Sequence, residues 1–209
     1  MSEKTDSRKT DFKKTQASYQ AREGVLAQVE VPSMQYLMID GQGDPNTAVF
    51  GDLIETLFAI AFPLKFVSKA ELGRDYVVPP LEGRWWADEL EYFTTRRDKS
   101  RWRWTLMVMT PAWLSVDHVA GVVESARRKK PALPLGDVRL ERLDEGLCVQ
   151  TLHVGAFDDE GSVLAQIHDE YLPEHGLRPV GTHHEIYLSD FRRVAPESRR
   201  TILRQPVTR

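Results

Sequence analysis

A short segment near the C-terminus carries the side chains best suited to chemistry. Residues 183–190 read HHEIYLSD. On a strand, alternation places His183, Glu185 and Tyr187 on one face and the apolar Ile186 on the other. The apolar face is expected to meet a helix, so Glu185 either faces solvent or lines a cleft beside a phenol. In an apolar cleft, this carboxylate would act as a general base or as the counter-ion of a lipophilic cation.

Aromatic side chains form a second candidate cluster. Trp85 and Trp86 are adjacent, and acidic residues and Tyr92 follow them. Aromatic faces stack on flat ligands and attract cations. Two neighbouring tryptophans on a strand point to opposite faces, so both cannot enter the same core. At least one therefore needs another partner, which can be a ligand, while core packing is the alternative for each.

Sharper catalytic signatures are absent from the sequence. It contains no P-loop, no H-E-x-x-H, no pair of C-x-x-C and no G-x-S-x-G. The glycines of residues 41–46, GQGDPN, lack a third glycine at dinucleotide spacing and indicate a turn. The six histidines are not spaced as metal ligands, and Cys148 lies in an apolar strand pattern typical of a buried thiol. We therefore expect neither a metal nor a cofactor.

Composition excludes several classes of protein. The chain has 209 residues, a net charge of -3 and 41% hydrophobic residues, as in an ordinary globular protein. Nucleic-acid-binding proteins usually carry a basic face, so we expect no direct DNA binding. The charged N-terminus does not resemble a secretory signal, and the most apolar run, residues 53–64, is too short to span a bilayer. A single cysteine fits a reducing compartment, so we expect a cytoplasmic protein without a membrane partner; the sequence does not fix its oligomeric state.

Hydrophobic periodicity and turn residues define the elements that must position these side chains. Residues 1–25 have no apolar periodicity and are predicted to be a flexible tail. Helices are predicted over residues 47–61 (ended by Pro63), 115–130 (capped by Ser115) and 158–174 (ended by Gly176). Strands are predicted over residues 26–40 (broken at Pro32), 75–79, 101–109, 138–143, 147–154, 183–188 and 201–207.

The order of these elements repeats. Strand, helix and two strands occur once over residues 26–111 and again over residues 138–207, and the helix at 115–130 joins the two copies. Each copy can lay its helix across a small antiparallel sheet. The predicted fold class is therefore α+β: two strand-helix-strand-strand modules whose sheets meet around a central ligand cleft, together forming one domain over residues 26–209.

Five strings in the chain resemble the GyrI-like small-molecule-binding proteins, which are relatives of the effector-binding domains of AraC- and MerR-type regulators. They are VPSMQYLMIDGQGDPN at 31–46, EGRWWADELEYF at 82–93, RWRWTLMVMTP at 101–111, HHEIYLSDFRR at 183–193 and TILRQPV at 201–207. The resemblance implies two modules around a ligand cleft, with Glu185 reaching the cleft. It also implies that Trp85, Trp86, Tyr36 and Tyr187 line it, and that the chain is a stand-alone member without a DNA-binding helix-turn-helix.

The resemblance leaves three functions open. One is binding of hydrophobic aromatic or cationic small molecules, for protection against xenobiotics or toxins, with Glu185 as counter-ion. The second is hydrolysis of the cyclopropane of DNA-alkylating compounds, with Glu185 activating water and Tyr187 donating a hydrogen bond to the developing oxyanion. The third is a protein-interaction module, such as a gyrase inhibitor, that uses an outer surface.

Overall fold

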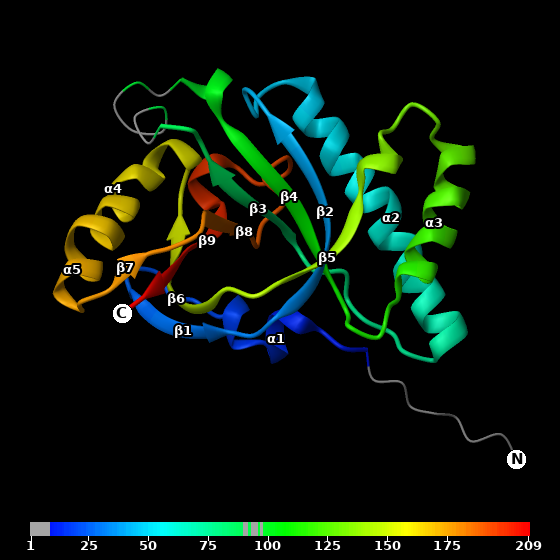
Figure 1. The fold of residues 1–209 in the computed structure, drawn as a ribbon, viewed down its shortest axis with the longest axis horizontal. Helices are drawn as coiled ribbons and strands as arrows, with labels where there is room; N and C mark the ends of the chain where they lie inside the picture. The colour runs from blue at the N-terminus through cyan, green and yellow to red at the C-terminus, as the bar shows by residue number, and fades with distance from the viewer. Residues whose placement is uncertain (1–8, 90–91, 93–95, 97) are drawn as a thin grey trace, which may run out of the picture.

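One antiparallel sheet organises the molecule (Figure 1). The structure is a computed structural model, and it describes residues 9–89, 92, 96 and 98–209. The described strands are β1 (Ala27–Val31), β2 (Met34–Gln42), β3 (Leu81–Trp86), β4 (Arg103–Thr110), β5 (Arg139–Leu143), β6 (Gly146–Val154), β7 (Arg178–Pro179), β8 (His183–Tyr187) and β9 (Arg200–Thr208). They pair in the order β1-β6-β9-β8-β3-β4-β2-β5, and β7 pairs with β9.

Helices connect these strands. The longer ones are α2 (Ala48–Leu72), α3 (Val116–Lys129) and a composite helix made of α4 (Glu160–Ala165), a π-helical segment (Gln166–Tyr171) and α5 (Leu172–Glu174). Short helical turns are α1 (Phe12–Thr15), η1 (Ala17–Tyr19), η3 (Lys99–Arg101), η4 (Leu135–Asp137), η5 (Phe157–Asp159) and η7 (Pro196–Ser198). No helix within the described ranges has the length and apolar character needed to cross a membrane.

The predicted α+β fold with two repeated modules is confirmed. Strand β2, helix α2 and strands β3 and β4 form the first module, while β6, the α4–α5 helix, β8 and β9 form the second. In each module the third strand lies between the other two, and the second strands, β3 and β8, pair with each other. The two small sheets therefore meet edge to edge and become one sheet with a junction at β3 and β8.

The edge strands tie the modules together. Strand β1 precedes β2 in the chain but pairs with β6 of the second module, and β5 precedes β6 but pairs with β2 of the first. Each of these strands thus forms the outer edge of the module to which its chain neighbour does not belong. This exchange requires the two modules to assemble as one unit.

Helix α2 and the α4–α5 helix cover the same face of the sheet. The registers align Gly83 with Glu185 and Glu185 with Leu203, so side chains at these positions share a face. On that face, Leu106 packs in the cluster under α2 and Leu203 packs in the cluster with Ile167 of the composite helix. Figure 1 shows α2 and α3 beside one half of the sheet and α4 and α5 beside the other, so the junction strands lie between them.

Helix α2 continues through Pro63, where the sequence predicted its end. Proline removes one backbone hydrogen bond and disfavours a helix interior. Here the residues beyond it, Leu64 and Ser68, are fully buried, and Pro63 itself is on the exposed side. Burial of the last turns outweighs the proline, and the helix ends at Gly73, which adopts the left-handed conformation.

Two other expectations need correction. Among the described residues, the strand expected at residues 75–79 makes only one bridge, between Tyr76 and Thr10, and it does not join the sheet. The N-terminal tail predicted to be flexible is folded against the body from residue 9 onward; residues 1–8 lie outside the described residues. Thr10 exchanges backbone hydrogen bonds with residues 75 and 77, and Tyr19 is 3% exposed.

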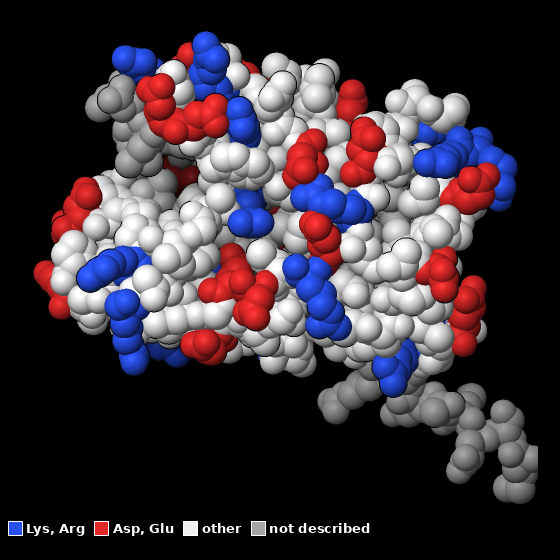
Figure 2. Space-filling view, viewed as in Figure 1, with Lys and Arg blue, Asp and Glu red and all other residues white. Residues whose placement is uncertain are grey.

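The surface carries both signs of charge. Figure 2 shows lysine and arginine interspersed with aspartate and glutamate over the face in view. The same view shows a hollow beside the start of α4, with atoms of acidic side chains in its depth.

Candidate functional site

The candidate site lies where β3 and β8 pair, on the face of the sheet that α2 and the α4–α5 helix cover. Strand β3 contributes Trp85, and β8 contributes His183, Glu185 and Tyr187, so the shared face predicted for the last three is confirmed. Side chains at these positions point to the same side because they alternate with residues directed to the other side. Glu185 is only 13% exposed and His183 16% exposed.

A chain of hydrogen bonds holds the Glu185 carboxylate. Trp85 Nε1 donates to the Tyr187 hydroxyl over 3.0 Å, and this hydroxyl donates to Glu185 Oε2 over 2.8 Å. His183 Nε2 lies 3.5 Å from the other carboxylate oxygen, Glu185 Oε1. Burial, followed by the negative charge of Glu185, raises the pKa of Tyr187 well above its ordinary value, so the phenol keeps its proton.

Gly83 makes room for this chain. A Cβ at position 83 would lie 2.9 Å from Trp85 Nε1 and 3.1 Å from the Tyr187 hydroxyl. The first distance is shorter than real Cβ contacts and the second is unusually tight, so a side chain at this position would push the Trp85 ring and crowd the Tyr187 hydroxyl. Glycine is required here for close approach.

Aromatic rings surround the polar chain on both sides. Around Trp85, the ring centroids of Phe50, Trp102 and Trp104 lie 5.9, 6.0 and 5.6 Å away. Around Tyr187, the rings of Phe157 and Phe191 lie 5.7 and 5.6 Å away in edge-to-face contact. The carboxylate of Glu185 therefore lies in an aromatic setting suited to a flat apolar ligand.

A second carboxyl group accompanies Glu185. Glu160 is the first residue of α4 and is 6% exposed, and its Oε1 atom has no hydrogen-bond partner among the described residues. Burial, then the charges of Glu185 and Asp158, raise the pKa of Glu160 to about 10. The ring nitrogens of His183 are also buried without a hydrogen-bond partner in the described part of the chain. Buried polar atoms without partners are uncommon, and a bound water or ligand can complete their bonding.

The structure divides the predicted site residues between two faces. It brings together Trp85, Glu185 and Tyr187. Trp86 pairs with Arg103 and points to the opposite face from Trp85. Tyr36 is 1% exposed and packs in the core cluster of the opposite face. Trp86 and Tyr36 therefore do not lie on the face that holds Glu185, and the expectation that they line the same cleft is wrong.

Sequence reasoning missed several residues of the site, namely Phe50, Phe157, Glu160 and Phe191. Acidic residues at 158–160 are what the first turn of a helix ordinarily carries, so the sequence marks none of them as a site residue. Only the fold shows that Glu160 is buried. Its direct sequence neighbours give no sign of this burial.

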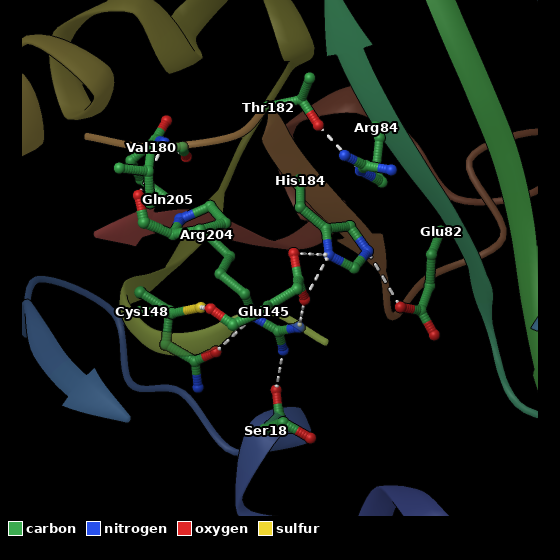
Figure 3. A network of polar contacts seen from close by, with 12 residues as sticks. Ser18, Glu82, Arg84, Glu145, Cys148, Val180, Thr182, His184, Arg204 and Gln205 are labelled. Atoms are coloured by element: carbon green, nitrogen blue, oxygen red, sulfur yellow. Dashed lines mark hydrogen bonds and ion pairs between the residues drawn. The ribbon is translucent and has the colours of Figure 1, made fainter. Parts of the chain in front are cut away.

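The opposite face of the junction carries a buried ionic network (Figure 3). His184 Nε2 lies 3.0 Å from Glu82 Oε2, and His184 Nδ1 lies 3.0 Å from Glu145. Arg204 Nη1 donates to Glu145 over 2.9 Å. Glu82 also accepts a hydrogen bond from Tyr19 of the N-terminal segment. The network pairs two carboxylates with two basic groups and leaves no net charge when His184 is protonated.

The pKa values of this network follow from its charges. Burial by itself would lower the pKa of His184, but the carboxylates of Glu145 and Glu82 outweigh burial and raise it. Burial would raise the pKa of Glu145, but His184 and Arg204 lower it to about 2. The network therefore favours the charged forms of Glu145 and His184 on the face of the sheet opposite the candidate site.

Comparison with known proteins decides the family. A family model for the GyrI-like small molecule binding domain matches residues 27–207. The chain belongs to the GyrI-like family. The search of curated proteins gave no match.

Solved structures of other proteins share this GyrI-like fold. An uncharacterized conserved protein from Listeria innocua is 36% identical, with a TM-score of 0.87 over 96% of this chain and 100% of that chain. A hydrolase from Listeria innocua is also 36% identical, with a TM-score of 0.82 over the same shares. The EcmrR C-terminal domain is 12% identical, with a TM-score of 0.53 over 88% of this chain and 98% of that chain, which shows a shared fold alone.

Proposed function

We propose that this GyrI-like protein binds flat, hydrophobic small molecules at the junction of β3 and β8 and hydrolyses electrophilic ones, with Glu185 as the general base. The observation that supports this most is the Glu185 carboxylate, which is held by Tyr187 and Trp85 inside an aromatic enclosure. A base must be oriented toward its substrate and reachable by a water molecule. A carboxylate that is fixed on one oxygen and 13% exposed meets both needs.

The proposed substrate is an electrophile conjugated to a carbonyl, such as an activated cyclopropane. The oxygen of water forms a bond to the ring carbon while Glu185 takes one proton from that water. The carbon–carbon bond of the ring breaks, and its electron pair moves through the conjugated system onto the carbonyl oxygen. Protonation of this system and loss of the proton from Glu185 complete the addition of water. The scheme uses no metal or cofactor.

The relative from Listeria innocua that is described as a hydrolase supports this choice over simple binding. It shares 36% of its residues and its whole length with the present chain. Shared ancestry at this level makes a shared reaction class a reasonable proposal, although the fold alone does not define chemistry.

A second candidate function is binding of lipophilic cations without turnover, for protection against xenobiotics. The Glu185 carboxylate next to the Trp85 and Tyr187 rings favours it, because aromatic faces and a carboxylate both attract a cation. In that case Glu185 is a counter-ion and needs no water.

Replacement of Glu185 by glutamine separates the two functions. The change keeps the shape of the side chain and removes the base. For a hydrolase, the kcat for a carbonyl-conjugated cyclopropane in oxygen-18 water should fall by about 100-fold or more, as is usual when a general base is lost. The Kd of the same neutral compound, measured by titration, should change little. The matched control is Glu30→Gln at an exposed position of β1.

The alternative outcomes are distinct. A binder would give no labelled product with the wild-type protein, and Glu185→Gln would weaken cationic dyes while sparing neutral dyes of the same shape. If Glu185→Gln leaves both turnover and dye affinities like those of Glu30→Gln, the assignment of the site to the junction face is wrong.

A further inference from the structure

The hydrolytic scheme needs a hydrogen-bond donor that Tyr187 does not provide. A phenol has one proton. In this structure the Tyr187 hydroxyl donates that proton to Glu185 and accepts a hydrogen bond from Trp85. A developing oxyanion must therefore find its donor elsewhere. The predicted oxyanion role of Tyr187 does not fit this arrangement, and Tyr187 is a positioning residue for Glu185.

Glu160 is placed to supply that donor. It lies at the start of α4, directly after η5, whose Phe157 ring contacts the ring of Tyr187. Its side chain is more than nine-tenths buried, and Oε1 has no hydrogen-bond partner among the described residues. None of the ion pairs between described residues includes Glu160. A buried carboxyl oxygen without a partner is costly unless a ligand or water completes its bonding.

The surroundings keep Glu160 protonated. The titratable groups facing it are Asp158 on its own segment and Glu185 and Tyr187 on β8. Burial, then Glu185 and Asp158, raise its pKa to about 10. His168 of the π-helical segment interacts with His183 instead. When two carboxyl groups share a site, one remains neutral, and it then donates a hydrogen bond where the other accepts a proton.

We propose that Glu160 is the acid of the site, donating a hydrogen bond from its neutral carboxyl to the substrate oxygen on which negative charge develops. The inference rests on the proposed hydrolysis and assigns its second catalytic group. As water adds to the electrophilic carbon, Glu185 takes the water proton, while Glu160 keeps its own proton and donates a hydrogen bond to the carbonyl oxygen on which the negative charge develops. The proton on Glu185 then passes to the resulting enolate, which restores Glu185, so that only water has been consumed.

This assignment restricts the class of substrate. The ligand must carry a hydrogen-bond acceptor, such as a carbonyl oxygen, conjugated to its electrophilic carbon. With Glu185 charged and Glu160 neutral, the pair has one negative charge, which disfavours anionic ligands. A neutral aromatic ketone or quinone-like electrophile fits both the acid and the aromatic rings around it.

Three variants test the role of Glu160. Glu160→Gln keeps an N–H donor that cannot ionise, whereas Glu160→Met keeps the bulk and removes the donor. Glu160→Met should lower kcat by about 100-fold, the usual effect of losing one oxyanion donor. Glu160→Gln should retain most of kcat. The control is Glu174→Gln, at an exposed position of α5.

The pH profile separates this role from a structural one. In the wild-type protein, kcat should fall as pH rises toward about 10, because Glu160 loses the proton through which it hydrogen-bonds the substrate oxygen. In Glu160→Gln this alkaline fall should disappear. A purely structural role would lower the stability of both variants and leave the shape of the profile unchanged, which would overturn the proposal.

Infrared difference spectroscopy tests the proposal even without turnover. The wild-type protein at pH 7 should show a protonated-carboxyl band that is missing in Glu160→Gln. Addition of a neutral aromatic ketone should shift this band. If the band shifts but no substrate is hydrolysed, the proposed hydrolysis fails and the donor role of Glu160 stands. If the band is absent or does not shift, Glu160 is not the acid of the site.

Discussion

At the scale of single residues, the face of the strand that a side chain occupies determines its role. Strand alternation correctly placed His183, Glu185 and Tyr187 together from the sequence alone. The same rule separates Trp85, which donates to Tyr187, from Trp86, which points to the other side. The sequence predicts that at least one of the two tryptophans needs a partner other than the same core, but it does not indicate which one.

This separation predicts different effects for two matched variants. Trp85→Phe removes the N–H that holds Tyr187 and changes the ring at the site, so flat ligands should bind about 1 kcal/mol more weakly. It should also remove most of the quenching of tryptophan fluorescence by the ligand. Trp86→Phe should leave both the affinity and the quenching near wild type. Equal losses in the two variants would contradict the assignment of faces.

The burial of Glu160 could not be predicted from its neighbours in the sequence. An acidic residue at the start of a helix is ordinary, because it complements the helix dipole. Its burial beside Glu185 depends on the packing of the second module against the sheet, which no local pattern reveals. The aromatic rings of Phe50 and Phe157 were missed for the same reason, since they reach the site from helical segments distant in sequence.

At the scale of elements, the site needs room on β3 for its polar side chains as much as it needs those side chains. Gly83 on β3 faces Glu185 on β8, and the space of a missing side chain is filled by Trp85 Nε1 and the Tyr187 hydroxyl. A glycine in a strand interior weakens the strand but permits such an approach. The site therefore depends on a glycine that makes β3 locally less stable than a residue with a side chain would.

Gly83→Ala and Gly121→Ala add the same atoms in different surroundings. At position 83 the new methyl group should displace Tyr187, lower kcat strongly and destabilise the protein by about 1–3 kcal/mol. Position 121 lies inside α3 with nothing within 4 Å of the added carbon. Gly121→Ala should stabilise the protein by up to about 1 kcal/mol and leave kcat unchanged. Thermal unfolding and turnover assays would check both. Unchanged turnover in Gly83→Ala would show that the Tyr187 contact is unnecessary.

The elements themselves were largely predictable. Strong periodicity gave the strands at β2, β4, β6 and β9 and the helix α3 with its Ser115 cap. Predictions from local sequence were wrong where contacts in the tertiary structure outweighed local preferences. Helix α2 passes Pro63 because Leu64 and Ser68 are buried beyond it, and residues 75–79 form no sheet strand because their partner is the N-terminal segment.

At the scale of the whole molecule, the ionic network opposite the site joins distant parts of the chain. Glu82 belongs to β3 and His184 to β8, so their ion pair crosses the junction of the two modules. Arg204 and Tyr19 add β9 and the N-terminal segment. The polar composition of that segment is typical of a tail, because its hydrophobic anchors are isolated aromatic residues: Phe12 packs against Tyr76 and Trp113, and Tyr19 is buried in the core cluster of the opposite face.

Removal of His184 should reveal this network in the pH dependence of stability. The folded-state pKa of His184 is raised above its ordinary value of 6.5. Its contribution to stability is therefore fully present below about pH 6.5 and is lost as pH rises through the folded-state pKa. Relative to wild type, His184→Gln should lower the free energy of unfolding by about 3–5 kcal/mol near pH 6, because it leaves buried carboxylates uncompensated.

This difference in the free energy of unfolding should narrow as the pH rises. Urea titrations at several pH values would measure it, with His175→Gln at an exposed position as the control. On the acid side, the lowered pKa of Glu145, about 2, adds stability that is present above its ordinary pKa and is lost as the pH falls toward 2. A destabilisation by His184→Gln that is constant or grows above pH 6.5 would contradict a charged His184.

The central claim is that ligands bind at the junction of β3 and β8 with their reactive carbon next to Glu185. A crystal structure of Glu185→Gln with an unreacted, neutral, carbonyl-conjugated cyclopropane tests it most directly. We predict that the ligand stacks beside Trp85, places its electrophilic carbon near the side-chain amide introduced at position 185 and directs its carbonyl oxygen to Glu160. A ligand bound instead on the Tyr36 face, or between α2 and α3, would contradict the account.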